Sequence, residues 1–221
     1  MLLVIGLASA FVGVVASLPG VGDAPARVEA ILLAHGSRAE SPPPPARLAA
    51  SIVAVEDAHF YDNVAVNVLD GAARAALATL HTQGDPGGST IPQQLAKALY
   101  GNGSASFTET LREIGLGVRL SLRYSDAQVL GMYLNAIYYG NGYWGDIAAA
   151  EGYFGVPPRR LSWAQASMLA GLPEAPSAYD PLLHLRLARE RQRHVLDRLV
   201  ATHVLSAAQA DRVFAEPLGL R

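Results

Sequence analysis

The stretch Gly87-Gly-Ser-Thr-Ile-Pro-Gln-Gln-Leu-Ala-Lys97 joins a glycine- and hydroxyl-bearing loop to the start of a helix. Pro92 falls in the first helical turn, where proline is tolerated because its missing N–H would have no intrahelical partner. The loop and the first turns bring together backbone N–H groups, the hydroxyls of Ser89 and Thr90, two amides and the ammonium of Lys97. Such a set of donors can bind an anion. Taken alone, however, a Gly-Gly-Ser-Thr turn favours an ordinary helix start.

The sequence on both sides of this stretch is patterned for helices. Four serines are each followed three residues later by Glu or Gln, which is the capping-box signature of a helix N-terminus: Ser106, Ser125, Ser162 and Ser206. Apolar residues recur at helical spacing after these caps. Further helices are expected around residues 48–58 and 182–202. No extended alternating run indicates a sheet, although short hairpins are compatible with the pattern. The predicted fold class is mainly α.

The composition sets limits on function. With 221 residues, the chain is long enough for one domain with a proper core. Its 51% hydrophobic and 16% charged content excludes an intrinsically disordered protein, and a formal net charge of -2 gives no bulk attraction for nucleic acid. The absence of cysteine excludes disulfides, thiolate metal sites and cysteine nucleophiles.

Lys97 is the only lysine among the 17 basic residues. The plain interpretation of the excess of arginine is codon bias in a GC-rich genome. A single retained lysine then indicates a position that needs a compact ammonium, which the planar guanidinium of arginine cannot replace.

Residues 1–19 are predicted to be a transmembrane signal-anchor. The stretch from Met1 to Leu18 has no charged residue, and Pro19-Gly20 ends it. At about 1.5 Å per residue it spans roughly 27 Å, close to the ~30 Å hydrocarbon core of a bilayer. A cleaved signal peptide and a buried core helix are the alternatives. Residues 20–46, with the proline run from Ser41 to Ala46, are expected to be a linker before a domain at 47–221.

Two acidic sites stand beside apolar segments. Glu56 and Asp57 end an otherwise uncharged run, and burial there would raise the pKa of a carboxyl group toward the range useful for proton transfer. From the residues alone, a solvated helix end is the favoured interpretation. Glu113 lies between Leu111 and Ile114, where a boundary carboxylate paired with neighbouring Arg112 is the plain alternative.

The order of these motifs resembles the peptidoglycan glycosyltransferase domain of monofunctional transglycosylases and of the N-terminal half of class A penicillin-binding proteins. The resemblance rests on collinear segments within residues 47–200: Glu56-Asp-Ala-His-Phe60, the Gly87–Lys97 stretch, Arg112-Glu113, Tyr133-Leu-Asn-Ala-Ile-Tyr-Tyr-Gly140, Ala148-Ala-Ala-Glu-Gly-Tyr-Phe-Gly155 and Ala166-Ser-Met-Leu-Ala-Gly-Leu-Pro-Glu-Ala-Pro-Ser177. It implies a lysozyme-like, two-lobed helical domain with an N-terminal transmembrane helix. It also implies a single-pass protein of the bacterial inner (plasma) membrane whose catalytic domain faces the periplasm or the outside.

The resemblance implies a reaction and a site. The 4-hydroxyl of lipid II attacks the anomeric carbon of the growing glycan chain, with inversion and release of undecaprenyl pyrophosphate. Glu56 matches the catalytic base, Glu113 the second catalytic glutamate on the leaving-group side, and Lys97 the lysine that faces the pyrophosphate. The implied substrate-binding residues are Asp57, Phe60, Ser89, Thr90, Gln94, Lys97 and Arg112. A divalent cation (Mg or Mn) at the pyrophosphate is implied, with no protein-only metal site and no organic cofactor. The implied partners are lipid II, the glycan chain, the membrane and cell-wall synthesis proteins.

The chain departs from the family pattern at several cations. Glu109 and Thr110 occupy the places of an expected Arg-Lys pair, which leaves Arg112 alone. Each lost charged hydrogen bond would weaken pyrophosphate binding by about 1.5–3 kcal/mol. The leading hypothesis is an active polymerase, expected to be monofunctional because few residues follow Thr202. A degenerate, non-catalytic lipid II or glycan binder is the alternative, and lysozyme-like hydrolysis is a third reading.

Other residues receive plainer interpretations. Tyr138 and Trp144 are expected to serve in packing rather than as a sugar platform, because aromatic side chains dominate cores. His35 and His194 are expected at the surface or its boundary, since the histidines lack metal-ligand spacing. The arginine series that includes Arg191 is expected to form a solvated helix face.

Overall fold

The structure, a computed structural model, describes residues 13, 15–39, 43–62, 89–104 and 106–221. These ranges form the helices α2 (Ala24–Ala34), α3 (Ala46–Glu56), α5 (Ile91–Tyr100), α6 (Phe107–Arg123), α7 (Asp126–Ala136), α8 (Gly145–Phe154), α9 (Trp163–Gly171), α10 (Leu185–Ala201) and α11 (Ala207–Ala215), with a short 3-10 helix η1 (Pro158–Arg160). They contain no β-strand, only an isolated bridge between Tyr138 and Trp144. The predicted mainly α class is confirmed.

Some sequence-based predictions fall outside these ranges. Most of the predicted anchor, part of the proline run, and Gly87 and Gly88 of the opening motif lie beyond the described residues. Within the described ranges, no helix combines the length and the apolar character needed to cross a bilayer. The transmembrane helix and the lysozyme-like architecture stay predictions.

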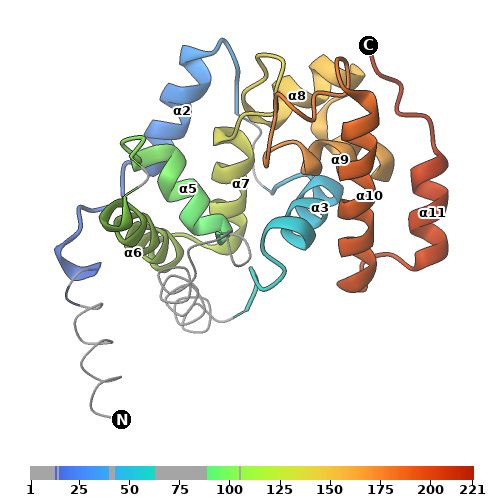
Figure 1. The fold of residues 1–221 in the computed structure, drawn as a ribbon. Helices are drawn as coiled ribbons and strands as arrows, with labels where there is room; N and C mark the ends of the chain where they lie inside the picture. The colour runs from blue at the N-terminus through green and yellow to red at the C-terminus, as the bar shows by residue number, and fades with distance from the viewer. Residues whose placement is uncertain (1–12, 14, 40–42, 63–88, 105) are drawn as a thin grey trace.

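The helices form two groups with α7 between them (Figure 1). In one group α5 packs against α6 and α7, and α2 also packs against α7. In the other group α3 packs against α9 and α10, while α11 lies along the outer side of α10 (Figure 1). Helices far apart in the sequence therefore lie side by side, and α3 meets α10 across more than a hundred residues of chain.

The helix starts follow the predicted caps, with one difference. Ser125, Ser162 and Ser206 each form a complete capping box with the glutamine three residues later. Ser106 accepts a hydrogen bond from the Glu109 N–H at 3.2 Å, but the Glu109 carboxylate turns to other partners. A full box therefore forms where the third residue is Gln, and half a box forms where it is Glu.

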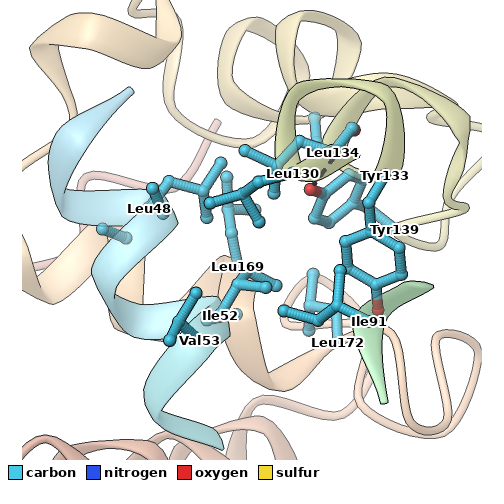
Figure 2. Packing of buried hydrophobic residues seen from close by; sticks show 14 of the residues in the cluster. Leu48, Ile52, Val53, Ile91, Leu130, Tyr133, Leu134, Tyr139, Leu169 and Leu172 are labelled. Atoms are coloured by element: carbon cyan, nitrogen blue, oxygen red, sulfur yellow. Dashed lines mark hydrogen bonds between the residues drawn. The ribbon is translucent and has the colours of Figure 1, made fainter. Parts of the chain in front are cut away.

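The core lies where α3, α7 and α9 meet (Figure 2). Fully buried side chains fill this space, including Leu48, Ile52, Ile91, Leu130, Tyr133, Leu134, Tyr139, Leu169 and Leu172. Removal of this apolar surface from water supplies the main favourable term for the fold. The hydroxyl of Tyr133 stays hydrogen-bonded within this core, because an unpaired polar group there would be costly.

Part of the segment predicted as a linker, residues 20–46, is the helix α2 in the structure. Ala24, Val28 and Leu32 recur every four residues and are buried, so α2 belongs to the packed body. Gly145 makes room for this contact, since a Cβ there would lie 2.8 Å from Leu32 Cδ2. A buried stripe only one residue wide in an Ala-rich segment gives a weak periodic signal, which explains why the sequence pattern missed it.

Arg119 on α6 joins the chain just before α2 to the helical body. Its guanidinium donates to the backbone carbonyls of Leu18 at 2.6 Å and Pro19 at 2.8 Å. Leu18 also packs over Gly115, where a Cβ would lie 2.5 Å from its Cδ1. The end of the apolar N-terminal segment is thus held on α6.

We expect Leu169→Ala to lower the free energy of unfolding by about 2–5 kcal/mol, because it leaves a cavity in the core between α3 and α9. The measurement is chemical denaturation followed by far-UV circular dichroism. Leu183→Ala is the control, since that side chain is exposed and its loss should change stability by no more than about 0.5 kcal/mol. Equal effects of the two substitutions would contradict this placement of the core.

Candidate active site

A cleft of about 870 Å³ opens between the two helix groups. Its lining comes from α3, α5, α6, α7, α10 and the segment after α9. Five of the predicted site residues line it: Glu56, Ser89, Gln94, Lys97 and Glu113. The structure therefore brings both predicted glutamates and the single lysine to one cavity.

Glu56 is oriented by a short chain of hydrogen bonds. Gln94 Nε2 donates to Glu56 Oε2 at 2.8 Å and to the Ser89 carbonyl at 3.0 Å. The Tyr133 hydroxyl donates to Gln94 Oε1 at 2.8 Å. Because both ends of the amide are engaged, its NH₂ group is held toward Glu56. Tyr133 is fully buried, so this series of hydrogen bonds is anchored in the core.

Arg191 is a site residue that the sequence analysis missed. It was expected on a solvated helix face, but its side chain is only 14% exposed and lines the cleft. One guanidinium nitrogen lies 2.7 Å from Glu174 Oε2, and another lies 3.9 Å from Glu56 Oε1. The prediction was wrong for this residue because α10 turns this side toward α9, a tertiary contact that an arginine-rich pattern does not reveal.

The surroundings of Glu56 favour its protonated form. Burial raises the pKa of the Glu56 carboxyl, since a charge is poorly solvated there. The hydrogen bond from Gln94 and the charge of Arg191 lower the pKa of this group but do not outweigh burial. A carboxylate with a raised pKa that faces a cleft is suited to accept a proton near neutral pH.

Glu113 and Lys97 lie on neighbouring helices of the cleft. Glu113 on α6 is buried, whereas Lys97 on α5 is exposed to the cleft. Burial raises the pKa of Glu113, and the positive charge of Lys97 opposes this shift. Lys97 follows Gln94 by three residues, so it lies about 4.5 Å further along α5 on the same face.

Three of the remaining predicted residues support the site from behind. Asp57 Oδ2 accepts a hydrogen bond from the Ile91 N–H at 3.1 Å, which ties the end of α3 to the start of α5. Thr90 caps α5 by accepting from the Gln93 N–H at 3.4 Å. Phe60 is buried in the core. None of these three is among the residues that line the cleft, and direct contact of any of them with substrate stays a prediction.

Arg112 is held beside the cleft by Glu109. Its Nη1 donates to Glu109 Oε1 and to the Tyr100 carbonyl, each at 2.9 Å. Glu109 is buried and also accepts from the Asn102 side chain at 3.2 Å. Neither Arg112 nor Glu109 lines the cleft, whereas Thr110 does. The negative charge of Glu109 is thus compensated by Arg112. At position 110 the cleft wall carries the hydroxyl of Thr110.

Two aromatic side chains expected in packing lie on the cleft wall. Tyr138 and Trp144 both line the cavity, with ring centroids 5.1 Å apart. Trp144 is stacked on His35, with ring centroids 4.3 Å apart and an interplanar angle of 7°. The packing interpretation therefore missed their position, since the turn after α7 brings this aromatic pair back to the cavity.

Among the three carboxylates that line the described part of the cleft, Glu56 is engaged by Gln94 and Glu174 by Arg191, so Glu113 is the one that could hold a divalent cation. Within the described ranges no group of three or more His, Asp or Glu side chains is placed to hold a metal ion. Mg²⁺ commonly binds through one or two carboxylates together with substrate phosphates and water. The donor set therefore fits a cation that enters together with a phosphate-bearing substrate.

We expect Glu56→Gln to raise the melting temperature by a few degrees at pH 8, because it removes a poorly solvated charge. The folded-state pKa of Glu56 is raised above its ordinary value of 4.5, so the ionised carboxylate reduces stability as pH rises through that window. The gain should therefore vanish below about pH 4. Scanning calorimetry across pH measures it, with Glu151→Gln, at an exposed ion pair with Arg38, as the control. A gain that is independent of pH would contradict the argument.

Comparison with known proteins supplies the family. A family described as Transglycosylase matches residues 37–200. A protein of Cupriavidus necator with the name "Putative transglycosylase H16_A0665" is 37% identical over 177 residues, which are 80% of this chain and 76% of that protein. Penicillin-binding protein 1A of Neisseria flavescens is 37% identical over 169 residues, and that of Neisseria gonorrhoeae is 36% identical over 169 residues.

The match to the penicillin-binding proteins is partial on their side. It covers 76% of this chain but only 21% of either Neisseria protein. Among solved structures, penicillin-binding protein 1A from Haemophilus influenzae is 28% identical, with a TM-score of 0.42 over 59% of this chain and 16% of that one. The extent of the family match and its agreement with the C. necator protein settle the question of kinship: this chain belongs to the transglycosylase family.

Proposed function

We propose that the chain polymerises lipid II into peptidoglycan glycan strands. Membership in the transglycosylase family supports peptidoglycan glycosyltransferase activity in general. The observation that supports the proposal most is the joint placement of Glu56, Lys97 and Glu113 around one cleft. A largely buried base at the end of α3, and a cation on α5 one helical turn after the Gln94 that holds this base, suit a reaction in which a hydroxyl attacks and an anion leaves.

In the proposed step the 4-hydroxyl of the acceptor attacks the anomeric carbon of the donor from the face opposite its pyrophosphate. Glu56 accepts the hydroxyl proton as the new C–O bond forms. The bond to the pyrophosphate breaks, and undecaprenyl pyrophosphate leaves with the electron pair, so the configuration at the anomeric carbon is inverted. Two carboxylates around a reacting anomeric carbon follow the logic of inverting glycosidases, which is an analogy.

Lys97 would stabilise the departing pyrophosphate. It is exposed to the cleft, and a charge-assisted hydrogen bond from its ammonium to a phosphate oxygen would strengthen as negative charge develops there. Glu113 would hold a divalent cation on the same side, and the chemistry such a cation supplies is neutralisation of the pyrophosphate charge. Gln94 keeps Glu56 in place throughout, through its hydrogen bond of 2.8 Å.

The proposal includes a location. Residues 1–19 would anchor the chain in the bacterial inner membrane as a single pass, with the cleft facing the periplasm or the outside. The partners would then be membrane-borne lipid II, the growing glycan chain and other cell-wall synthesis proteins. The chain spans about a fifth of the length of the penicillin-binding proteins it resembles. A monofunctional polymerase is a separate part of the proposal.

A second candidate function is binding of lipid II or glycan without catalysis. The observation that favours it is the small number of cations among the described lining residues: Thr110 in the cleft wall is neutral, and Arg112 lies outside the cleft and is held by Glu109. Weaker neutralisation of pyrophosphate would slow its departure while sugar contacts were kept. Product formation distinguishes the two functions.

We expect Glu56→Gln to reduce glycan synthesis from labelled lipid II by about 10²–10⁴-fold, because the acceptor hydroxyl loses its base. The measurement is the ladder of glycan products on a gel, in the presence of a divalent cation. Glu216→Gln, at the exposed end of α11, is the control that should keep full activity. Binding of lipid II with no product from the unaltered chain would contradict polymerisation, and release of soluble muropeptides from finished peptidoglycan would favour hydrolysis.

We expect Lys97→Arg to lower kcat/KM for lipid II by roughly tenfold, although it keeps the charge. The guanidinium is larger and planar, so it cannot occupy the same point beside Glu113 as a compact ammonium. Lys97→Met, which removes the charge, should cost more. Equal activity of Lys97→Arg and the unaltered chain would remove the argument that the ammonium itself is needed.

A further inference from the structure

The Arg191 guanidinium makes three contacts to three different parts of the chain. Its Nη1 lies 2.7 Å from Glu174 Oε2, and its Nη2 lies 3.9 Å from Glu56 Oε1. Its Nε donates to the Gly171 carbonyl, the last residue of α9, at 3.3 Å. The cation is therefore shared between two carboxylates, in close contact with one and at a longer distance from the other.

Packing of α10 on α9 holds the aliphatic stem of Arg191 in place. Gln192, the next residue on α10, is fully buried and donates to the Ala164 carbonyl at 2.8 Å and to Ser167 Oγ at 3.1 Å, which holds α10 against α9. Gly171 admits the Arg191 stem, since a Cβ there would lie 2.8 Å from Arg191 Cγ. The guanidinium thus has little room to move as long as Glu174 holds it.

The charge of Glu174 matters because an unopposed cation would weaken the base. A positive charge within about 4–6 Å favours the ionised form of a carboxyl group. If Arg191 acted on Glu56 alone, the carboxylate would be stabilised and would accept a proton less readily. Glu174 offsets this effect in two ways, by its own negative charge and by drawing the guanidinium toward itself.

We propose that Glu174 is a positioning residue that keeps Arg191 away from Glu56 and so preserves the basicity of Glu56. This inference rests on the proposed function of Glu56 as the base. Glu174 lies in the turn after Pro173, outside any helix, and its side chain is 51% exposed at the cleft. It acts through Arg191 and touches no reacting atom.

Other charged or titratable groups around Glu56 stay in place when Glu174 is changed. Asp57, next to Glu56 in the chain, lies behind the cleft wall. The others line the cleft: Lys97 on α5, Glu113 on α6, Tyr133 on α7, Tyr138 after α7 and His194 on α10. Among the described residues, none of these groups forms a hydrogen bond or ion pair with Glu174. A change in the pKa of Glu56 when Glu174 is substituted therefore reports how Glu174 and Arg191 act on Glu56.

The first test compares the pH dependence of kcat/KM for lipid II in the full chain and in two variants. Glu174→Gln leaves Arg191 unopposed, so the acidic limb of the profile should move to lower pH by about half a unit to one unit, and kcat should fall by roughly three- to tenfold. Arg191→Gln should move the same limb to higher pH. Opposite directions are the signature of the proposed arrangement.

Glu190→Gln is the matched control. It removes one negative charge from α10 directly beside Arg191, but its carboxylate is exposed and paired with Arg186. We expect it to leave both the acidic limb and kcat unchanged. If Glu174→Gln moves the limb no further than Glu190→Gln does, or moves it to higher pH, the proposal is overturned.

A second test needs no activity. The titration of Glu56 is followed by NMR of the chain labelled with ¹³C at the glutamate side-chain carboxyls, and Glu56→Gln identifies the signal. Glu174→Gln should lower the pKa measured for Glu56, and Arg191→Gln should raise it, while Glu190→Gln should not change it. If these pKa shifts are observed but the unaltered chain makes no glycan, only the proposed function is contradicted. If the pKa shifts are absent or reversed, the role of Glu174 is overturned whatever the activity.

Discussion

The burial of one carboxylate, Glu56, is the constraint on which the site depends. A charge at the end of an apolar helix is costly unless hydrogen bonds or an opposite charge compensate it. Gln94 and Arg191 supply this compensation from two helices that belong to the two separate groups. The carboxylate is therefore held where α3, α5 and α10 converge, and its basicity is set by how completely each partner compensates it.

Helix α5 sets the position of Lys97 in the cleft relative to Glu56. Its first residue donates to Asp57, Thr90 caps it, and Gln94 and Lys97 follow on one face, so the position of Glu56 fixes that of the cation. Helix α6 can approach α5 closely because Gly117 has no side chain, and a Cβ there would lie 3.0 Å from the Gln93 nitrogen. Glu113, one turn before Gly117, is brought to the same cleft by this close approach.

The sequence predicts the parts of this site that lie within local motifs. Glu56, Gln94, Lys97 and Glu113 are singled out because each belongs to a short segment that resembles a family motif, and the structure brings them to one cleft. From the residues alone, a solvated helix end is the favoured interpretation of Glu56. The helices follow from capping serines and apolar spacing. Arg191, Glu174 and helix α2 could not be found in this way. An arginine in an arginine-rich helix is assigned to solvent by its pattern, and only the packing of α10 on α9 buries it beside a residue far away in the sequence.

The balance of charge in the cleft bears on how the pyrophosphate of the proposed reaction would be accommodated. The described lining residues include three carboxylates, at Glu56, Glu113 and Glu174, and the cations Lys97 and Arg191. Arg191 is neutralised by its short contact with Glu174, and Arg112 is neutralised outside the cleft by Glu109. Lys97 is thus the cation of the described lining that is left to face an anion, in agreement with the role proposed for it. Because a pyrophosphate carries more than one negative charge, a cation bound together with the substrate beside Glu113 would complete the compensation that Lys97 begins.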